Sequence, residues 1–99
     1  MLYCKIGDEP EFREMLYDKD NEIIGLSGDM SFFMINDVDA DDTHNVTCDS
    51  ENSYIVTRLT TVETARSGMY RCGYIIEYAG GVKITVPNRG NMWLNIGGI

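Results

Sequence analysis

The sequence predicts an all-β domain of two packed sheets, and three observations carry this prediction. No segment shows the 3.6-residue apolar period of a long helix. Short runs of alternating apolar and polar residues instead end at Gly, Asn, Asp, Ser or Pro, as strands do. The stretch 64–72 places Gly68, Tyr70 and Cys72 between two β-branched runs, which is the order of a strand, a tight corner and a second strand. Eight or nine short strands without a helix suit a two-sheet sandwich.

The strands of the first half follow from their turn signals. Strand 2–6 ends at the Gly-Asp-Glu-Pro stretch, strand 12–17 turns at Asp-Lys-Asp-Asn, and strand 22–26 ends at Ser-Gly-Asp. Strand 31–35 runs into the acidic loop 36–42.

The strands of the second half follow in the same way. Strand 45–48 is expected to pair with strand 54–59 across the turn between them. Strand 69–78 follows the corner and ends at an Ala-Gly-Gly hairpin turn. The chain returns through 82–86, is interrupted at Pro87, and makes a last strand over 92–96.

Length and charge limit the function. The 99 residues fit one domain, 1–99, expected to be a fragment of a larger ectodomain. The net charge of −8 repels phosphate backbones, so no nucleic-acid partner is expected. No apolar run reaches the roughly 18 residues of a membrane span, and no signal segment is recognisable. Membrane attachment is therefore expected only through a tail outside this fragment.

Cysteine usage and a sequon indicate an oxidising, extracellular address. Three cysteines in a small β-rich chain are typical of such a compartment. Asn45-Val46-Thr47 is an N-glycosylation sequon, which makes Asn45 a candidate glycosylation site. The expected location is the cell surface, as the ectodomain of a membrane protein.

The spacing Ser67-Gly68-x-Tyr70-x-Cys72 resembles the corner and F strand of the immunoglobulin superfamily, variable-set type. The resemblance implies a two-sheet immunoglobulin-like β-sandwich that starts at strand B with Cys4. It also implies a Cys4–Cys72 disulfide between the sheets and a tyrosine corner at Tyr70. The separation 72 − 4 = 68 suits a variable-type domain. A disulfide that closes a loop of that size stabilises the folded state by about 4 kcal/mol.

The sequence departs from the family pattern in two places. Tyr17, or Leu16, stands where the family has its C-strand tryptophan. Arg66 stands where the family has an acid, so a charge-swapped pair with Asp41 or Asp42 is expected. This drift suggests an affinity with invertebrate self/non-self recognition receptors.

Cys48 is the odd cysteine of the sequence. It is either a half-buried free thiol or bonded to another chain or segment.

Catalytic and metal-binding patterns are missing from the sequence, so we expect neither an enzyme nor a cofactor. His44 is the only histidine, and no nucleophile lies in a recognisable strand-to-helix turn. The cysteines and His44 lack zinc-ligand spacing. The Asp37-x-Asp39-x-Asp41 run has the alternation of a calcium loop, but Asp42 and Cys48 stand where an EF-hand needs Gly and Glu.

A protein-binding face is expected on the C–F–G sheet. If Tyr70 and Cys72 point inward, then Arg71, Ile75 and Glu77 point outward on strand F. Glu14 and Leu16 are expected on the same sheet face.

The segment 77–91 is the second candidate for partner contact, with Tyr78 as its first aromatic residue. Val82–Val86 is either strand G, with its side chains in the core, or a projecting hairpin. If it is strand G, Trp93 lies near the exit from the domain.

Together these expectations describe an extracellular recognition domain of a cell-surface receptor or adhesion protein. Its partner is another protein or a second copy of itself, as in cell–cell self/non-self recognition. The alternative is a heterophilic immune-type receptor or a secreted decoy that binds an unrelated ligand.

Overall fold

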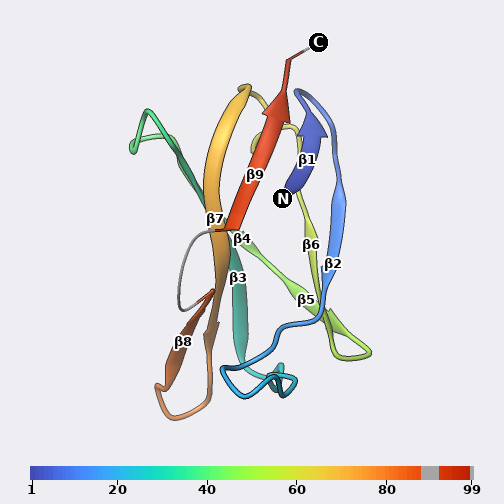
Figure 1. Ribbon diagram of the computed structural model, residues 1–99, viewed down its shortest axis with the longest axis vertical. Helices are drawn as coiled ribbons and strands as arrows, with labels where there is room; N and C mark the ends of the chain where they lie inside the picture. The colour runs from blue at the N-terminus through green and yellow to red at the C-terminus, as the bar shows by residue number, and fades with distance from the viewer. Residues whose placement is uncertain (88–91, 99) are drawn as a thin grey trace.

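The computed structural model describes residues 1–87 and 92–98, which contain nine strands and no helix (Figure 1). No helix in this described part is long or apolar enough to cross a membrane. The large sheet has the order β1-β9-β7-β3-β4, with β8 also paired to β7, and the small sheet has the order β2-β6-β5. The strands are β1 (Leu2–Lys5), β2 (Glu11–Glu14), β3 (Asp29–Asn36), β4 (Thr43–Thr47), β5 (Asp49–Glu51), β6 (Tyr54–Arg58), β7 (Gly68–Glu77), β8 (Lys83–Val86) and β9 (Met92–Gly97).

The core lies between the two sheets, so the predicted all-β, two-sheet architecture is confirmed. The large sheet contributes Phe32 and Tyr74, whose ring centroids are 5.4 Å apart, and the small sheet contributes Phe12 and Ile55. Phe32, Tyr74 and Ile55 are fully buried. This arrangement is compatible with a β-sandwich.

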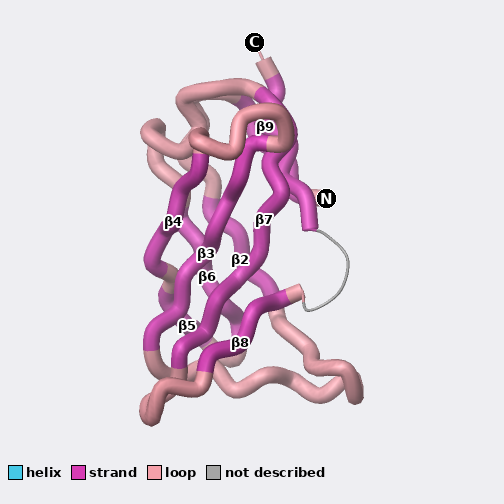
Figure 2. Tube along the Cα trace, turned by 90° about the vertical axis from the view of Figure 1, so that its left-hand side faces the viewer, coloured by secondary structure: helices cyan, strands magenta, loops and turns pink. Residues whose placement is uncertain are grey.

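Strand β7 organises the large sheet. It pairs with β3 on one side over residues 70–77. On its other side, β9 pairs with its first half and β8 with its second half, so the two short strands follow one another beside β7 (Figure 2). Residues 83–86 therefore form a strand of the sheet, with Ile84 and Val86 packed on the core, whereas Val82 is 61% exposed.

The strands before β4 differ from those that the resemblance to the immunoglobulin superfamily implied. Residues 22–26 are not a strand; one isolated bridge joins Tyr17 to Ile23, and Tyr17 is 52% exposed. The place beside β7 belongs to β3, which brings Phe32 to the centre of the core. Every residue of the run 30–36 is at least partly buried, and periodicity alone could not show which face of this strand is the inner one.

The hairpin expected over 45–59 is also different. Strand β4 pairs with β3 in the large sheet, and only β5, three residues long, pairs with β6.

The expected Cys4–Cys72 disulfide is wrong, because all three cysteines lie among the described residues and are buried free thiols. Cys4 lies on β1 and Cys72 on β7, in the same sheet, with β9 between them. Cys4 is level with Ile96 and Cys72 with Met92, so the two cysteines are roughly 10 Å apart across the strands and roughly 13 Å apart along them. A disulfide needs Cα atoms within about 7 Å.

A turn directly precedes β7, as the sequence predicts, and Tyr70 follows it on the strand. Gly68 has a φ of +147°, a conformation that disfavours a side chain. The buried Tyr70 hydroxyl donates to Asp42 Oδ2 at 2.6 Å, in the β3–β4 connection. Arg66 Nη1 lies 2.9 Å from Asp39 Oδ2 and 3.5 Å from Asp42 Oδ2, so the expected charge-swapped pair forms with Asp42 and Asp39 and not with Asp41.

Candidate functional site: the outer face of the large sheet

The outer face is the side of the large sheet that points away from the core. Successive side chains of a strand alternate between faces, so the fully buried Tyr70 and Tyr74 fix Arg71 as outward. The pairing register extends this assignment, since Arg71 lies beside Ile35 on β3 and beside Trp93 on β9. The register of the remaining pairs defines this face in the same way for all six strands of the large sheet.

Apolar side chains occupy much of the outer face. Phe33 of β3 packs across Gly73 of β7, where an added Cβ would lie 2.8 Å from the ring Cζ and 2.5 Å from the carbonyl oxygen of Val86. Glycine at this position therefore lets the ring and β8 approach β7 closely. The partly or largely exposed apolar and aromatic residues of this face are Tyr3, Phe33, Ile35, Met69, Ile75 and Trp93.

The charges on the outer face are separated along β7. Arg71 and Glu77 are six residues apart on the same side of the strand, a distance of roughly 20 Å. Asp29 pairs in register with Glu77 from β3, and Lys83 does so from β8. None of these four makes a salt bridge with another residue of the described chain.

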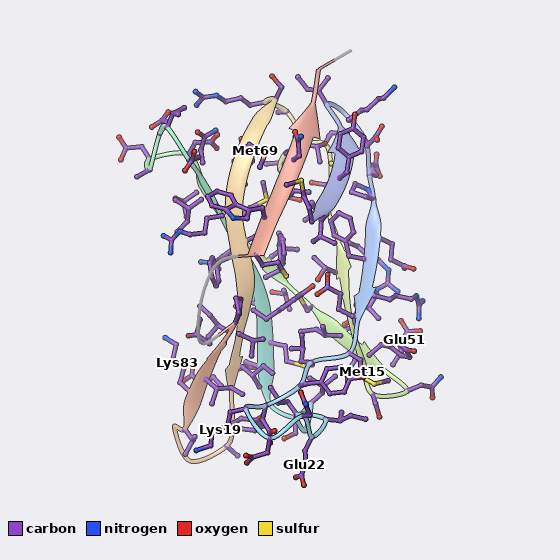
Figure 3. All side chains as sticks on the ribbon, in the orientation of Figure 1. Met15, Lys19, Glu22, Glu51, Met69 and Lys83 are labelled. Carbon is purple, nitrogen blue, oxygen red and sulfur yellow. The ribbon has the colours of Figure 1, made fainter. Side chains whose placement is uncertain are left out.

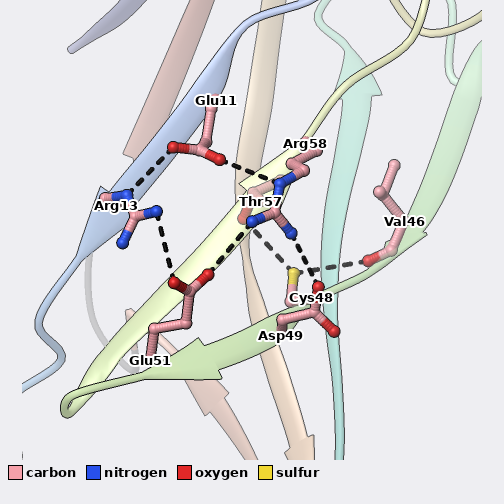
Figure 4. A network of polar contacts seen from close by, with 8 residues as sticks. All are labelled: Glu11, Arg13, Val46, Cys48, Asp49, Glu51, Thr57 and Arg58. Atoms are coloured by element: carbon pink, nitrogen blue, oxygen red, sulfur yellow. Dashed lines mark hydrogen bonds and ion pairs between the residues drawn. The ribbon is translucent and has the colours of Figure 1, made fainter.

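The outward side of the small sheet has a different character. Arg58 contacts Glu11, Asp49 and Glu51 at 2.8–3.1 Å (Figure 4). Val56 belongs to this side by its register, yet it is only 1% exposed because the charged side chains cover it. Lys83 on β8 and Glu51 on β5 lie at opposite sides of the molecule (Figure 3).

Hydrogen bonds and charges in this network favour the ionised state of Glu11, Arg13 and Arg58. The hydrogen bond from Arg13, together with Arg58, holds the pKa of Glu11 below its usual value. The small sheet therefore presents a network of ion pairs, beside which Tyr54 is the exposed aromatic residue.

The structure places only part of the predicted binding set on the outer face. Arg71, Ile75 and Glu77 lie there, as predicted. Tyr78 is half-buried at the end of β7 and donates its hydroxyl to the Gly25 carbonyl at 2.7 Å.

Two members of the predicted set lie elsewhere. Glu14 belongs to β2 of the small sheet and faces inward with Phe12, which is packed against the core. Leu16 is only 5% exposed. Both assignments were wrong because they depended on taking the segment around Tyr17 as a strand beside β7.

The sequence did not predict five of the six apolar and aromatic residues on this face, namely Tyr3, Phe33, Ile35, Met69 and Trp93. The strand that carries Phe33 and Ile35 is apolar on both faces, so alternation gave no signal there.

Asn45 is exposed on β4, and its register places it beside Phe33 on the outer face. No group of three or more potential metal ligands occurs within residues 1–87 and 92–98.

No protein-family profile, curated protein or solved structure matches this chain.

Proposed function

We propose that the chain is a divergent variable-set immunoglobulin-like domain of a cell-surface receptor or adhesion protein, and that it binds a protein partner through the outer face. The strand order supports the variable-set assignment. In such domains one sheet contains strands G, F, C and C′, and the other contains B, E and D. The orders β9-β7-β3-β4 and β2-β6-β5 correspond to these strands, with β1 added beside β9.

The contrast between the two outward sides carries the binding proposal. The outer face exposes apolar side chains, whereas ion pairs cover the small sheet. Contiguous exposed apolar surface on a soluble domain indicates a contact site. Flat apolar centres with charges near the rim are typical of protein interfaces.

A second copy of the domain is the partner that the charge pattern favours. Two copies can pack face to face about a two-fold axis that crosses β7 near residue 74. This arrangement sets Arg71 of each copy against Glu77 of the other, because both lie about three residues from the axis. Asp29 beside Glu77 strengthens the acidic end of each copy.

An extracellular setting is part of this proposal, and the exposed Asn45 supports it. The cysteines do not support it, since they form no bridge. A glycan on Asn45 would stand at the β4 side of the outer face, so the contact is centred on β7 and β9.

Charge reversal tests the pairing in sedimentation experiments from about 1 μM to about 1 mM protein. Arg71→Glu alone and Glu77→Arg alone should each be monomeric, because each places like charges together. An equimolar mixture of the two single variants should associate, because both contacts then join opposite charges. Ile75→Asp should also abolish association, whereas Tyr54→Asp, on the exposed side of the small sheet, should not.

A wild-type domain that stays monomeric throughout this range would refute self-pairing. The heterophilic receptor or decoy would then be tested by cell mixing, with the domain tethered to one cell population only. Binding to the second population that Ile75→Asp abolishes and Tyr54→Asp preserves would retain the outer face as the contact. Equal binding by both variants would refute the outer face itself.

A further inference from the structure

A cavity of about 430 Å³ opens between the end of β2, the inner side of β7 and the adjoining ends of β8 and β9. Its size falls within the range of small-molecule sites. It lies on the inner side of the large sheet, away from the outer face that is proposed to bind a protein partner. Among its lining residues are Glu14, Leu16, Tyr74, Val86 and Met92.

The Tyr74 hydroxyl is an unsatisfied polar group in this cavity. Tyr74 is fully buried, and its oxygen is the one buried side-chain N or O atom of the described residues without a hydrogen-bond partner. Native proteins satisfy nearly all such groups with protein, water or ligand. The hydroxyl therefore marks a place where a bound polar group would be stabilised.

The Glu14 carboxyl belongs to a second polar residue that lines the cavity. It is half-buried and makes no salt bridge with any basic residue in the described part of the chain. Burial raises the pKa of Glu14, and the raised pKa of Tyr74 comes first from burial and then from the charge of Glu14, which lines the same cavity. A negative group in this position attracts a cation and repels an anion.

The walls of the cavity are apolar. Leu16 is buried, and Val86 and Met92 are packed against the core. An occupant must therefore combine a charged head with a hydrocarbon body. A metal ion does not fit, because the described residues around Glu14 contain no group of three or more potential ligands.

We propose that this cavity binds a small primary ammonium compound with an apolar substituent. The ammonium donates hydrogen bonds to the Glu14 carboxylate and to the Tyr74 oxygen, and the hydrocarbon part packs on Leu16, Val86 and Met92. One occupant thereby gives the Tyr74 oxygen a hydrogen-bond partner and the Glu14 carboxylate a counter-ion, and it fills the apolar space.

Binding is tested with n-butylammonium, 1-butanol and butyrate, which share size and differ in the head group. Chemical-shift changes of the Leu16 and Val86 methyl groups, which belong to residues lining the cavity, report occupancy. Saturation-transfer NMR provides an independent measurement of binding. A ligand of five heavy atoms is expected to bind with a Kd on the order of 1 mM. 1-Butanol should bind at least tenfold more weakly, and butyrate should not bind.

Two variants test whether Glu14 and Tyr74 contact the ammonium head group. Glu14→Gln should weaken n-butylammonium binding at least tenfold, and Tyr74→Phe about threefold. Glu11→Gln is the matched control, because Glu11 lies on the same strand and points outward. Lowering the pH to protonate Glu14 should weaken binding by the wild type, which tests the carboxyl even if Glu14→Gln does not fold.

Equal affinity for n-butylammonium and 1-butanol, unchanged affinity in Glu14→Gln, or no binding in either measurement would overturn the proposal. The inference is independent of the proposed function, because Arg71→Glu should bind n-butylammonium like the wild type.

Discussion

Replacing Asp42 by asparagine should destabilise the domain more than any other single polar change at the corner. Asp42 is 15% exposed at its side chain and accepts the Tyr70 hydroxyl at 2.6 Å and Asn36 Nδ2 at 3.2 Å. It also faces His44 Nε2 at 3.0 Å and Arg66 Nη1 at 3.5 Å. One carboxylate thus connects β3, β4, β7 and the loop before β7.

The expected loss follows from these contacts. A hydrogen bond to a charged group contributes about 1.5–3 kcal/mol and a neutral one about 0.5–1.5 kcal/mol. An asparagine side chain keeps the shape and an acceptor oxygen but loses the charge, so we expect Asp42→Asn to lower the free energy of unfolding by about 2 kcal/mol. Tyr70→Phe should lower it by about 1.5 kcal/mol, and the double variant by about 2.5 kcal/mol.

Urea and thermal melts of the four proteins measure the coupling between Asp42 and Tyr70, expected at about 1 kcal/mol. The loss in Asp42→Asn corresponds to a drop in Tm of roughly 10 °C for a domain of this size. Strictly additive losses in the two single variants would show that the bond from Tyr70 to Asp42 contributes nothing, and the explanation of the corner would then be wrong.

The same variant has a defined pH dependence. Burial opposes the ionisation of Asp42, but the hydrogen bonds from Tyr70, His44 and Asn36 outweigh it and hold its pKa below the ordinary value. A lowered carboxyl pKa stabilises the folded state above about pH 4, and this contribution is lost as the pH falls through the lowered pKa. The difference between wild type and Asp42→Asn should be complete at neutral pH and shrink below about pH 4.

Three further predictions concern the sheets and the thiols. Gly73→Ala should destabilise the domain by about 1–3 kcal/mol in urea melts, because the new Cβ would meet the Val86 carbonyl oxygen; an unchanged midpoint would contradict this packing. Arg58→Ala should lower stability by about 1 kcal/mol or less, with the loss reduced at high salt, and a larger, salt-independent loss would mean that covering Val56 matters more than the ion pairs. A reducing agent should leave Tm unchanged, and a thiol reagent should react slowly with the native domain and with three thiols after unfolding; fewer than three would indicate a disulfide.

The sequence predicted the features that depend on local chemistry. Gly68 produced the corner, the Ala79-Gly80-Gly81 turn joined β7 to a strand that pairs with it, and alternation gave the outward residues of β7. These predictions needed only neighbouring residues and the period of a strand.

Features that depend on strand pairing could not be predicted in this way. Cys4 and Cys72 have a suitable spacing in sequence, but the parallel pairing of β1 with β9 puts both in one sheet. The misplacement of Leu16 followed from treating 12–17 as one strand, whereas β2 ends at Glu14. The outward position of Phe33 became visible only from its register with Gly73.

Glu14 provides the last prediction, since a half-buried carboxyl without a cation is unfavourable for folding. Burial raises its pKa, so the folded state holds this proton more tightly than the unfolded chain. The contribution of protonated Glu14 to the free energy of unfolding is largest below the ordinary glutamate pKa of about 4.3. This contribution is lost as the pH rises through the raised pKa of Glu14. Glu14→Gln should remove this decline, and Glu11→Gln, whose pKa is shifted in the opposite direction in the wild type, should not. Urea melts between about pH 4 and pH 7 distinguish the two variants, and identical pH profiles for wild type and Glu14→Gln would show that the carboxyl is not desolvated.

If the decline in stability is present and n-butylammonium reverses it at neutral pH, the ligand and the proton compete to neutralise the same carboxyl. The residue that is unfavourable for folding then has a role in binding.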